Sequence, residues 1–324
     1  MTLNKKLIVG IAIVLLSCSY GIGQTLTDAA SSYNQGRNLM STDVSAAIDS
    51  VLACIKSCNI VGDSAANALK EKANIFLADL YCQKSVKLYT KDKNIAEAIV
   101  FGKKSVELSE INKDDKGKDK AQKLLITFYV GMGANYFKAN DNVNALKAFD
   151  SALSINPNYI KALLNKALVY KKMDNATKFG ETVEAFIEKA KIENDTVQIV
   201  QVKKLAFEYY RGAASKSDQA NKLPDALALL AQAEKYGTDK DINYYYADVY
   251  NKQKKFEDAL TYAQKGLELE TGTPEAKAKF YYVIAVAQAG KGDKDNACAS
   301  FKSAMFGQFV EASKAQMANL KCGQ

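Results

Sequence analysis

The chain of 324 residues contains no histidine and no tryptophan, and it has only 3 prolines and 18 glycines. Imidazole is the commonest general base near neutral pH and the commonest metal ligand. The lack of histidine therefore excludes Ser-His-Asp triads, Cys-His pairs and histidine-bound metals. Tryptophan often lines sugar-binding surfaces, so its absence argues against a carbohydrate receptor, although 18 tyrosines remain. Few prolines and glycines favour a helical chain.

Motifs of known catalytic classes are also missing. The sequence has no phosphate-binding loop, no G-x-S-x-G elbow and no metal-ligand spacing. The glycines in residues 271–273 and 290–293 are interpreted as turns between helices. We therefore predict a protein that is not an enzyme and that holds no cofactor and no metal.

The charged residues are of both signs and are interleaved along the chain. The formal net charge is +8, and two of the lysines, Lys5 and Lys6, lie in the segment that we expect to be removed. Acidic and basic side chains alternate in stretches such as residues 113–116. This pattern indicates a solvated surface and argues against a nucleic-acid partner.

The first residues have the three parts of an export signal. Lys5 and Lys6 precede an apolar run over residues 7–16, and small and polar residues follow up to Gln24. The apolar run is shorter than the roughly 20 residues that a membrane-spanning helix needs. We predict a signal peptide of residues 1–23, a mature chain without a transmembrane helix, and export to the periplasm or the periplasmic face of the outer membrane.

Two processing routes stay open for this signal. Residues 21–23 are a small-x-small site for cleavage before Gln24, which is the preferred route. Residues 15–18 resemble a bacterial lipobox in which Cys18 would be lipidated, and this would attach the protein peripherally to a membrane. The bulky Leu16 and the lack of an obvious polar tether after Cys18 argue against lipidation.

An internal repeat is clearest in residues 126–159, ITFYVGMGANYFKANDNVNALKAFDSALSINPNY. With Ile126 as position 1, small residues stand at positions 8, 20 and 27, and large residues at positions 4, 7, 11 and 24. Position 32 is a proline. These are Gly133, Ala145 and Ala152, then Tyr129, Met132, Tyr136 and Phe149, and finally Pro157. The pattern resembles a tetratricopeptide repeat (TPR), in which small residues let two antiparallel helices approach closely.

Weaker copies of the pattern occur around residues 44–48, 89–99, 246–259 and 284–304. The resemblance implies an all-α fold: a right-handed superhelical solenoid of stacked antiparallel helical hairpins, forming a single array over residues 24–324. Each hairpin needs its neighbours to cover its apolar face. The seven predicted hairpins are residues 27–60, 63–112, 117–156, 159–192, 194–237, 238–271 and 273–307, and residues 308–320 form a capping helix.

Five of the six cysteines lie beyond the signal, so at least one thiol stays unpaired. Cys298 and Cys322 flank the end of the last hairpin, and a disulfide between them would stabilise the C-terminal end by roughly 3 kcal/mol. Cys54 and Cys58 are one helical turn apart, and either one is a candidate to pair with Cys82 on the next helix. The alternative for these three is that they are small core residues.

In TPR proteins the first helix of each hairpin lines a concave groove, and positions 2, 5, 9, 12 and 13 face into it. The usual clamp for a peptide carboxylate is absent, because Val130 and Ala134 occupy positions 5 and 9 of the clearest repeat. The resemblance implies a groove with aromatic members and a basic edge, suited to a peptide with apolar anchors and acidic residues. The candidate groove residues are Phe137, Lys138, Lys171, Lys172, Tyr244, Asp248, Asn251 and Tyr282. Packing between hairpins is the alternative for the tyrosines.

Export combined with a repeat array predicts a non-catalytic protein-protein interaction scaffold or adaptor in the bacterial cell envelope, with a protein or peptide partner in the groove. The alternative is an exported glycan-binding protein built on a TPR-like scaffold. Function in repeat proteins depends on variable surface residues, so the sequence does not name the partner.

Overall fold

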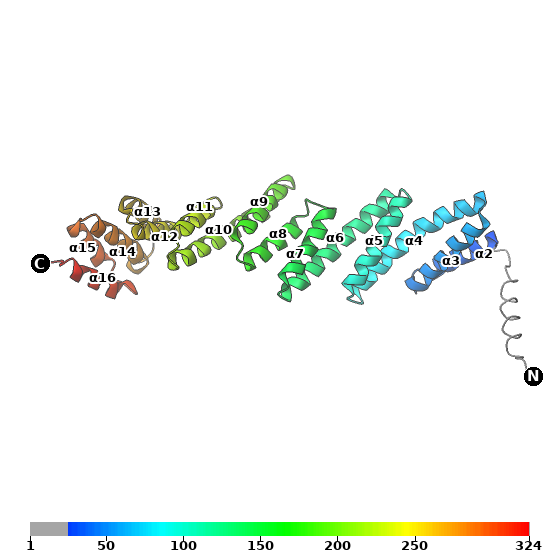
Figure 1. Cartoon of the computed structure of the whole chain (residues 1–324), viewed down its shortest axis with the longest axis horizontal. Helices are drawn as coiled ribbons and strands as arrows, with labels where there is room; N and C mark the ends of the chain where they lie inside the picture. Colours follow the sequence, from blue (N-terminus) through cyan, green and yellow to red (C-terminus); the bar gives the residue numbers. More distant parts are fainter. Residues whose placement is uncertain (1–24, 324) are drawn as a thin grey trace, which may run out of the picture. The chain divides into compact units, whose positions relative to one another are not determined.

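The computed structural model describes residues 25–323, and these residues form helices joined by short turns (Figure 1). Fifteen helices, α2 to α16, and no strands occur in this part of the chain. The all-helical class predicted from the sequence is confirmed. The predicted signal peptide of residues 1–23 and the alternative lipidation site Cys18 lie outside the described residues.

The chain divides into two compact units, residues 1–165 and 166–324. The single array predicted over residues 24–324 therefore stays a prediction. The boundary falls within α8 (Ile160–Lys172). Unit 1 contains α2 (Leu26–Leu39), α3 (Val44–Val61), α4 (Ser64–Thr90), α5 (Ile95–Ile111), α6 (Asp115–Lys138) and α7 (Asn142–Ile155). Unit 2 contains α9 (Ala176–Ile192), α10 (Thr196–Gln219), α11 (Leu223–Glu234), α12 (Lys240–Lys252), α13 (Phe256–Leu269), α14 (Pro274–Gly290), α15 (Lys294–Ser303) and α16 (Phe309–Asn319).

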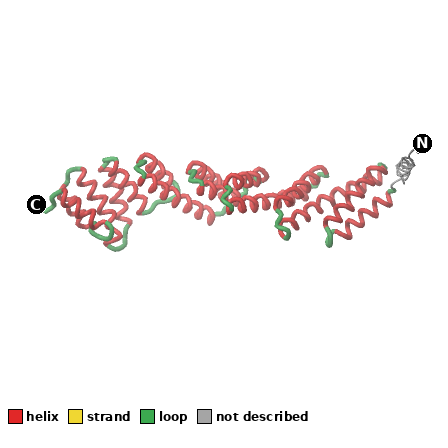
Figure 2. The backbone as a smooth tube through the Cα atoms, turned by 60° about the horizontal axis from the view of Figure 1, so that its bottom comes forward, coloured by secondary structure: helices red, strands yellow, loops and turns green. Residues whose placement is uncertain are grey.

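Within each unit, consecutive helices form hairpins that pack on their neighbours. In unit 1, α2 packs on α3, α4 on α5 and α6 on α7, and the first helices of successive hairpins also touch. In unit 2 the hairpins are α10–α11, α12–α13 and α14–α15, while α9 packs on α10 and α16 packs on α14 and α15. Figure 2 shows short loops between the helices of both units. The helix pairs coincide within a few residues with the predicted hairpins, and each unit has the hairpin stacking of a TPR-like solenoid.

The turns use a recurring combination of a left-handed residue and a helix cap. Asn140 has a φ of 63°, and the side chain of the next residue, Asp141, accepts a hydrogen bond from the backbone N–H of Asn144. In unit 2 the same combination occurs at Asn194, with a φ of 56°, and the cap Asp195. Short polar side chains tolerate the left-handed region and satisfy free N–H groups at a helix start. These local preferences determine where along the chain the turns between helices occur.

The clearest repeat packs as its pattern predicts. Gly133 faces the ring of Phe149, and a Cβ atom at residue 133 would lie 2.6 Å from Phe149 Cε1. Ala145, Phe149 and Ala152 are all fully buried. In unit 2 a glycine makes a similar contact between successive hairpins: Gly266 on α13 lies where a Cβ atom would be 2.3 Å from Phe280 Cε1 on α14. Small residues therefore set the close approach of neighbouring helices, both within a hairpin and between hairpins.

Among the described helices, α3 alone is long and apolar enough to cross a membrane by length and composition, with a mean hydropathy of 1.5 over 18 residues. In the structure α3 packs on α2 and α4. Its residues Ala47, Val51 and Cys54 are fully buried in the first core cluster of unit 1. The apolar side of α3 thus serves the packing of the first two hairpins.

Candidate functional site

We define the A-helix face as the side of unit 2 formed by α10, α12 and α14, the first helices of its hairpins. An ion-pair ladder crosses this face from helix to helix. Arg211 on α10 forms an ion pair with Asp239 and lies 3.7 Å from Asp241, measured from Nη1 to Oδ2. Lys279 Nζ on α14 lies 2.5 Å from Asp241 Oδ1. The side chains of Arg211, Asp241 and Lys279 are 26%, 37% and 26% exposed, so the ladder is held in place and still reaches solvent.

A second ion-pair group lies near the other end of α12. Lys252 Nζ is 2.7 Å from Asp218 on α10 and 2.8 Å from Asp248 on α12. Both Asp218 oxygens accept hydrogen bonds from Lys252, and Asp218 is buried. Burial raises the pKa of Asp248, and the neighbouring Asp218 carboxylate adds to this rise while the Lys252 ammonium opposes it. This group ties α10 to α12 and carries one more negative than positive charge.

The predicted groove tyrosines take part in packing. Tyr244 makes an edge contact with Phe280 at a centroid distance of 6.2 Å, and Lys279 Nζ lies 5.6 Å from the centroid of its ring. Tyr282 packs between Phe301 and Phe309, with centroid distances of 5.7 and 5.3 Å. Burial raises the pKa of Tyr244 and of Tyr282. Both residues are half-buried, so part of each side chain remains exposed.

Asn251 requires a correction. It is buried, and its Nδ2 donates a hydrogen bond to the carbonyl oxygen of Val283 at 2.8 Å. The side chain therefore joins α12 to α14 and does not line an open groove. The expectation failed because position 12 of this repeat faces the next first helix.

The predicted basic edge is distributed over both units. Phe137 and Lys138 end α6 in unit 1, where Phe137 is half-buried and Lys138 is exposed. Lys171 and Lys172 end α8 in unit 2, and Lys171 lines a cavity of about 210 Å³ beside Tyr209. A groove that joins all four residues stays a prediction.

On the A-helix face itself, four cations are paired with carboxylates. Lys240 Nζ lies 2.7 Å from Glu270 Oε2, and the two groups described above hold Arg211, Lys252 and Lys279. This face is thus of mixed charge and not basic. Sequence reasoning missed the pairing because Asp218 and Asp241 lie on different hairpins from their partners.

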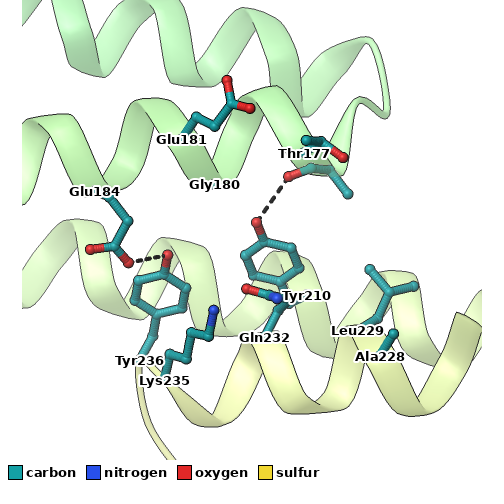
Figure 3. A pocket seen from close by; sticks show the side chains of 11 residues that line it. Thr177, Gly180, Glu181, Glu184, Tyr210, Ala228, Leu229, Gln232, Lys235 and Tyr236 are labelled. Carbon is teal, nitrogen blue, oxygen red and sulfur yellow. Dashed lines mark hydrogen bonds between the residues drawn. The ribbon is translucent and has the colours of Figure 1, made fainter.

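A second feature of unit 2 is a cavity of about 380 Å³ between α9, α10 and α11, which we call the tyrosine cavity (Figure 3). Tyr236 donates a hydrogen bond from its hydroxyl to Glu184 Oε1 at 2.6 Å, and Tyr210 donates to the carbonyl oxygen of Ala176 at 2.9 Å. The two rings are parallel, with centroids 6.0 Å apart. Sequence reasoning missed this cavity because it is lined mainly by second helices of hairpins, outside the groove positions.

The cysteines fall into two groups. Cys298 and Cys322 form a disulfide with Cα atoms 5.7 Å apart, which links α15 to the segment after α16. Cys54, Cys58 and Cys82 are free and buried, with the Sγ atoms of Cys54 and Cys58 4.0 Å apart. Burial, followed by the neighbouring Cys58, raises the pKa of the Cys54 thiol to about 12. Within residues 25–323, no group of three or more Cys, Asp or Glu side chains is placed to hold a metal ion.

No protein-family model matches the sequence, and no curated protein matches it. Several solved structures of TPR proteins do match. A TPR protein from Parabacteroides merdae is 14% identical, over 91% of this chain and 99% of that chain, with a TM-score of 0.30. The TPR domain of P58(IPK) is 14% identical, over 91% of this chain and 98% of that chain, with a TM-score of 0.33.

YrrB, described as a TPR protein with an unusual peptide-binding site, is 15% identical over 61% of this chain and 89% of that chain, with a TM-score of 0.34. All three TM-scores lie below 0.5. The helical-hairpin fold rests on the packing of this chain's own helices. These structures are TPR proteins to which the chain is similar in fold.

Proposed function

We propose that the protein is a non-catalytic scaffold that binds a partner polypeptide on the A-helix face of unit 2. The observation that carries this proposal is the ladder of Arg211, Asp241 and Lys279, which crosses three helices. Because each of these side chains is held by a neighbour, little side-chain entropy is lost when a partner contacts them. Preorganised charges of this kind confer specificity and orient a partner.

The charges of this face indicate what sort of segment would bind. Positive and negative groups alternate from α10 to α14, and the edges of Tyr244 and Tyr282 lie among them. A segment that carries both basic and acidic residues, with an apolar side chain between them, complements such a surface. The sequence predicts a peptide with apolar anchors and acidic residues. The proposed segment also carries basic residues, because four cations of the face already have carboxylate partners.

Location in the cell envelope is part of this proposal. It is supported by the signal pattern of residues 1–23 and by the disulfide between Cys298 and Cys322, since such bonds persist in oxidising compartments. An adaptor of an envelope assembly is the function that we infer from these two features together with the repeats.

Ser215 provides the test of the binding face. It is half-buried and follows Arg211 by one turn, on the same side of α10. Ser215→Arg places a bulky cation on the A-helix face, and we expect it to lower partner recovery at least about tenfold in cross-linked co-purification from envelope extract. The tyrosines are less suitable for substitution because they also pack in the core.

Ala231→Arg is the matched control, because Ala231 is exposed on α11, a second helix. We expect this variant to recover the partner as well as the wild type does, and both variants to keep their helical circular dichroism. Equal recovery by the two variants, or the absence of any stoichiometric partner, would argue against the A-helix face as the binding surface.

A further inference from the structure

We propose that the tyrosine cavity binds a carboxylate attached to an apolar group. This site is separate from the A-helix face, and the inference does not depend on the function proposed for that face. The cavity of about 380 Å³ lies between α9 and α11 with Tyr210 of α10 at its base (Figure 3). Its volume is at the lower end of the roughly 300–1,000 Å³ found for small-ligand pockets.

The two tyrosines present apolar surface to the cavity, because their hydroxyls are already hydrogen-bonded within the protein. The hydroxyls of Tyr210 and Tyr236 donate to Ala176 and Glu184, so the rings and not the hydroxyls are available to a ligand. Burial raises the pKa of both tyrosines, and the nearby Glu184 adds to the rise, so both hydroxyls stay protonated donors at neutral pH. Leu229 extends the apolar wall on α11.

Small residues form part of the cavity lining. Gly180 has no side chain, and a Cβ atom there would lie 2.2 Å from the Tyr210 hydroxyl. Ala176 and Ala228 line the same space. An apolar group of a ligand that contacts this surface gains binding free energy of roughly 25 cal/mol for each Å² of its own area that is buried.

Two donors at the C-terminal end of α11 line this space, Gln232 and the C-cap residue Lys235. Figure 3 shows the Lys235 ammonium directed between Tyr236 and Tyr210. Neither side chain has an ion pair or hydrogen bond with any residue of the described chain, 25–323. The two residues are three positions apart on one helix, so they can contact a single ligand group. A carboxylate accepts from both an ammonium and an amide, and the charged hydrogen bond is the stronger.

Each acidic residue of the cavity already has a partner within the described chain. Glu181 Oε2 lies 2.7 Å from Lys178 Nζ, and Glu184 accepts the hydrogen bond from Tyr236. Of the three charged lining residues, Lys235 is thus the one without a partner in the described chain. Its ammonium is therefore the charged group that remains available to pair with the carboxylate of a ligand.

Nuclear magnetic resonance of the full chain, with labelled leucine methyl groups, tests this site. The probes are 3-phenylpropionate, its charge-reversed counterpart 2-phenylethylamine and the neutral 3-phenylpropanol. We expect 3-phenylpropionate to shift the Leu229 methyl signals saturably and to bind at least tenfold more tightly than the other two. Lys235→Met should weaken this binding at least tenfold, and Ala228→Leu should block it by filling the cavity.

Lys222→Met is the matched control, because Lys222 lies at the start of α11 and does not line the cavity. It should leave binding unchanged. A hexapeptide that ends in phenylalanine separates two sources of the ligand. Tenfold tighter binding of its free-acid form than of 3-phenylpropionate indicates a polypeptide C-terminus, and equal binding indicates a free carboxylic acid.

Three results would overturn the inference. These are a Leu229 shift by 2-phenylethylamine equal to that by 3-phenylpropionate, unchanged binding in Lys235→Met, and the absence of saturable shifts with every carboxylate probe. The leucine spectra report folding of each variant at the same time, so a variant that fails to fold is recognised and Ala228→Leu then stands as the second test.

Discussion

At the scale of single residues, the spacing of the paired helices depends on where a side chain is missing. Gly133 on α6 leaves room for the fully buried ring of Phe149 on α7. Gly212 on α10, in contrast, has no atoms within 4 Å of a Cβ position. An alanine at residue 133 would therefore change both side-chain packing and backbone freedom, whereas an alanine at residue 212 would change backbone freedom alone.

We predict that Gly133→Ala destabilises the protein and that Gly212→Ala stabilises it. The added Cβ of residue 133 would meet Phe149 at 2.6 Å, and overpacking of this kind costs about 1–3 kcal/mol, more than the helix-propensity gain. Gly212→Ala has no such contact and should gain about 0.5–1 kcal/mol. Urea unfolding of the two full-length variants measures both changes. Equal stability of the two would contradict the packing assigned to Gly133.

Glu270 allows a prediction of pH dependence. Its side chain is 4% exposed and accepts from Lys240 Nζ at 2.7 Å and from the backbone N–H of Gly272 at 2.9 Å. The hydrogen bond from Lys240, followed by that from Gly272, lowers the pKa of Glu270 below its ordinary value of 4.5. A lowered folded-state pKa stabilises the fold above the unfolded pKa, and this stabilisation is lost as the pH falls through the folded pKa.

We therefore predict that Glu270→Gln lowers the melting temperature at pH 7, and that the difference from the wild type narrows as the pH falls below 4.5. Thermal scans over this pH range measure the effect. Glu268→Gln, at an exposed position near the end of α13 two residues before Glu270, should leave the melting temperature nearly unchanged at every pH. A pH-independent difference for Glu270→Gln would mean that its ion pair with Lys240 does not form.

At the scale of helices, the C-terminal capping helix α16 has the fewest buried residues of the described helices. Ser313 is the buried residue of α16, and Phe309, Met317 and Leu320 are partly buried near Tyr282 and Phe301. The disulfide between Cys298 and Cys322 holds this helix against α15. We therefore expect the packing of α16 against α14 and α15 to depend on the disulfide.

Cys322→Ser is predicted to destabilise unit 2 by roughly 3 kcal/mol, because the bond closes a loop with a sequence separation of 24 residues. Hydrogen exchange should speed up in α16 and stay slow in α12. Reduction of the wild type with dithiothreitol should reproduce the loss, and the same treatment should leave the variant unchanged. Full stability of the reduced wild type would contradict this role of the disulfide.

The helices could be placed from sequence because their signals are local. Residues such as Asn140 and Asp141 determine a turn through their own backbone and side-chain preferences, and Gly133, Ala145 and Ala152 mark a tight hairpin within one repeat. Such signals need no knowledge of distant residues. These signals gave the ranges of the hairpins, and the resemblance to TPR proteins implied the all-helical class.

The candidate site could be predicted only in part because its contacts join different hairpins. Tyr244 and Asp248 lie on α12 and are half-buried, and their contact with a partner stays a prediction. Asn251, on the same helix, is buried and donates a hydrogen bond to Val283. The charge of the face depends on Asp218, whose partner Lys252 belongs to the next hairpin. A repeat pattern gives the position of a side chain on its helix, while its partner depends on how neighbouring hairpins pack.

At the scale of the whole molecule, the chain consists of two compact units, and both are built of helical hairpins. Such a fold supplies surfaces and does not by itself supply chemistry, so function rests on particular faces. Unit 2 carries both the A-helix face and the tyrosine cavity, and α10 contributes different residues to each, Arg211 to the face and Tyr210 to the cavity. Variants at residues that belong to one site alone test the two sites separately.

The central claim is that a partner polypeptide contacts the A-helix face of unit 2, and site-specific photocross-linking tests it most directly. A benzophenone amino acid is introduced at Ser215 on α10 in one protein and at Ala231 on α11 in another, and both are irradiated in intact cells. The account predicts one dominant cross-linked partner from residue 215 and little from residue 231. Cross-linking from residue 231 alone, or from neither residue, would contradict it.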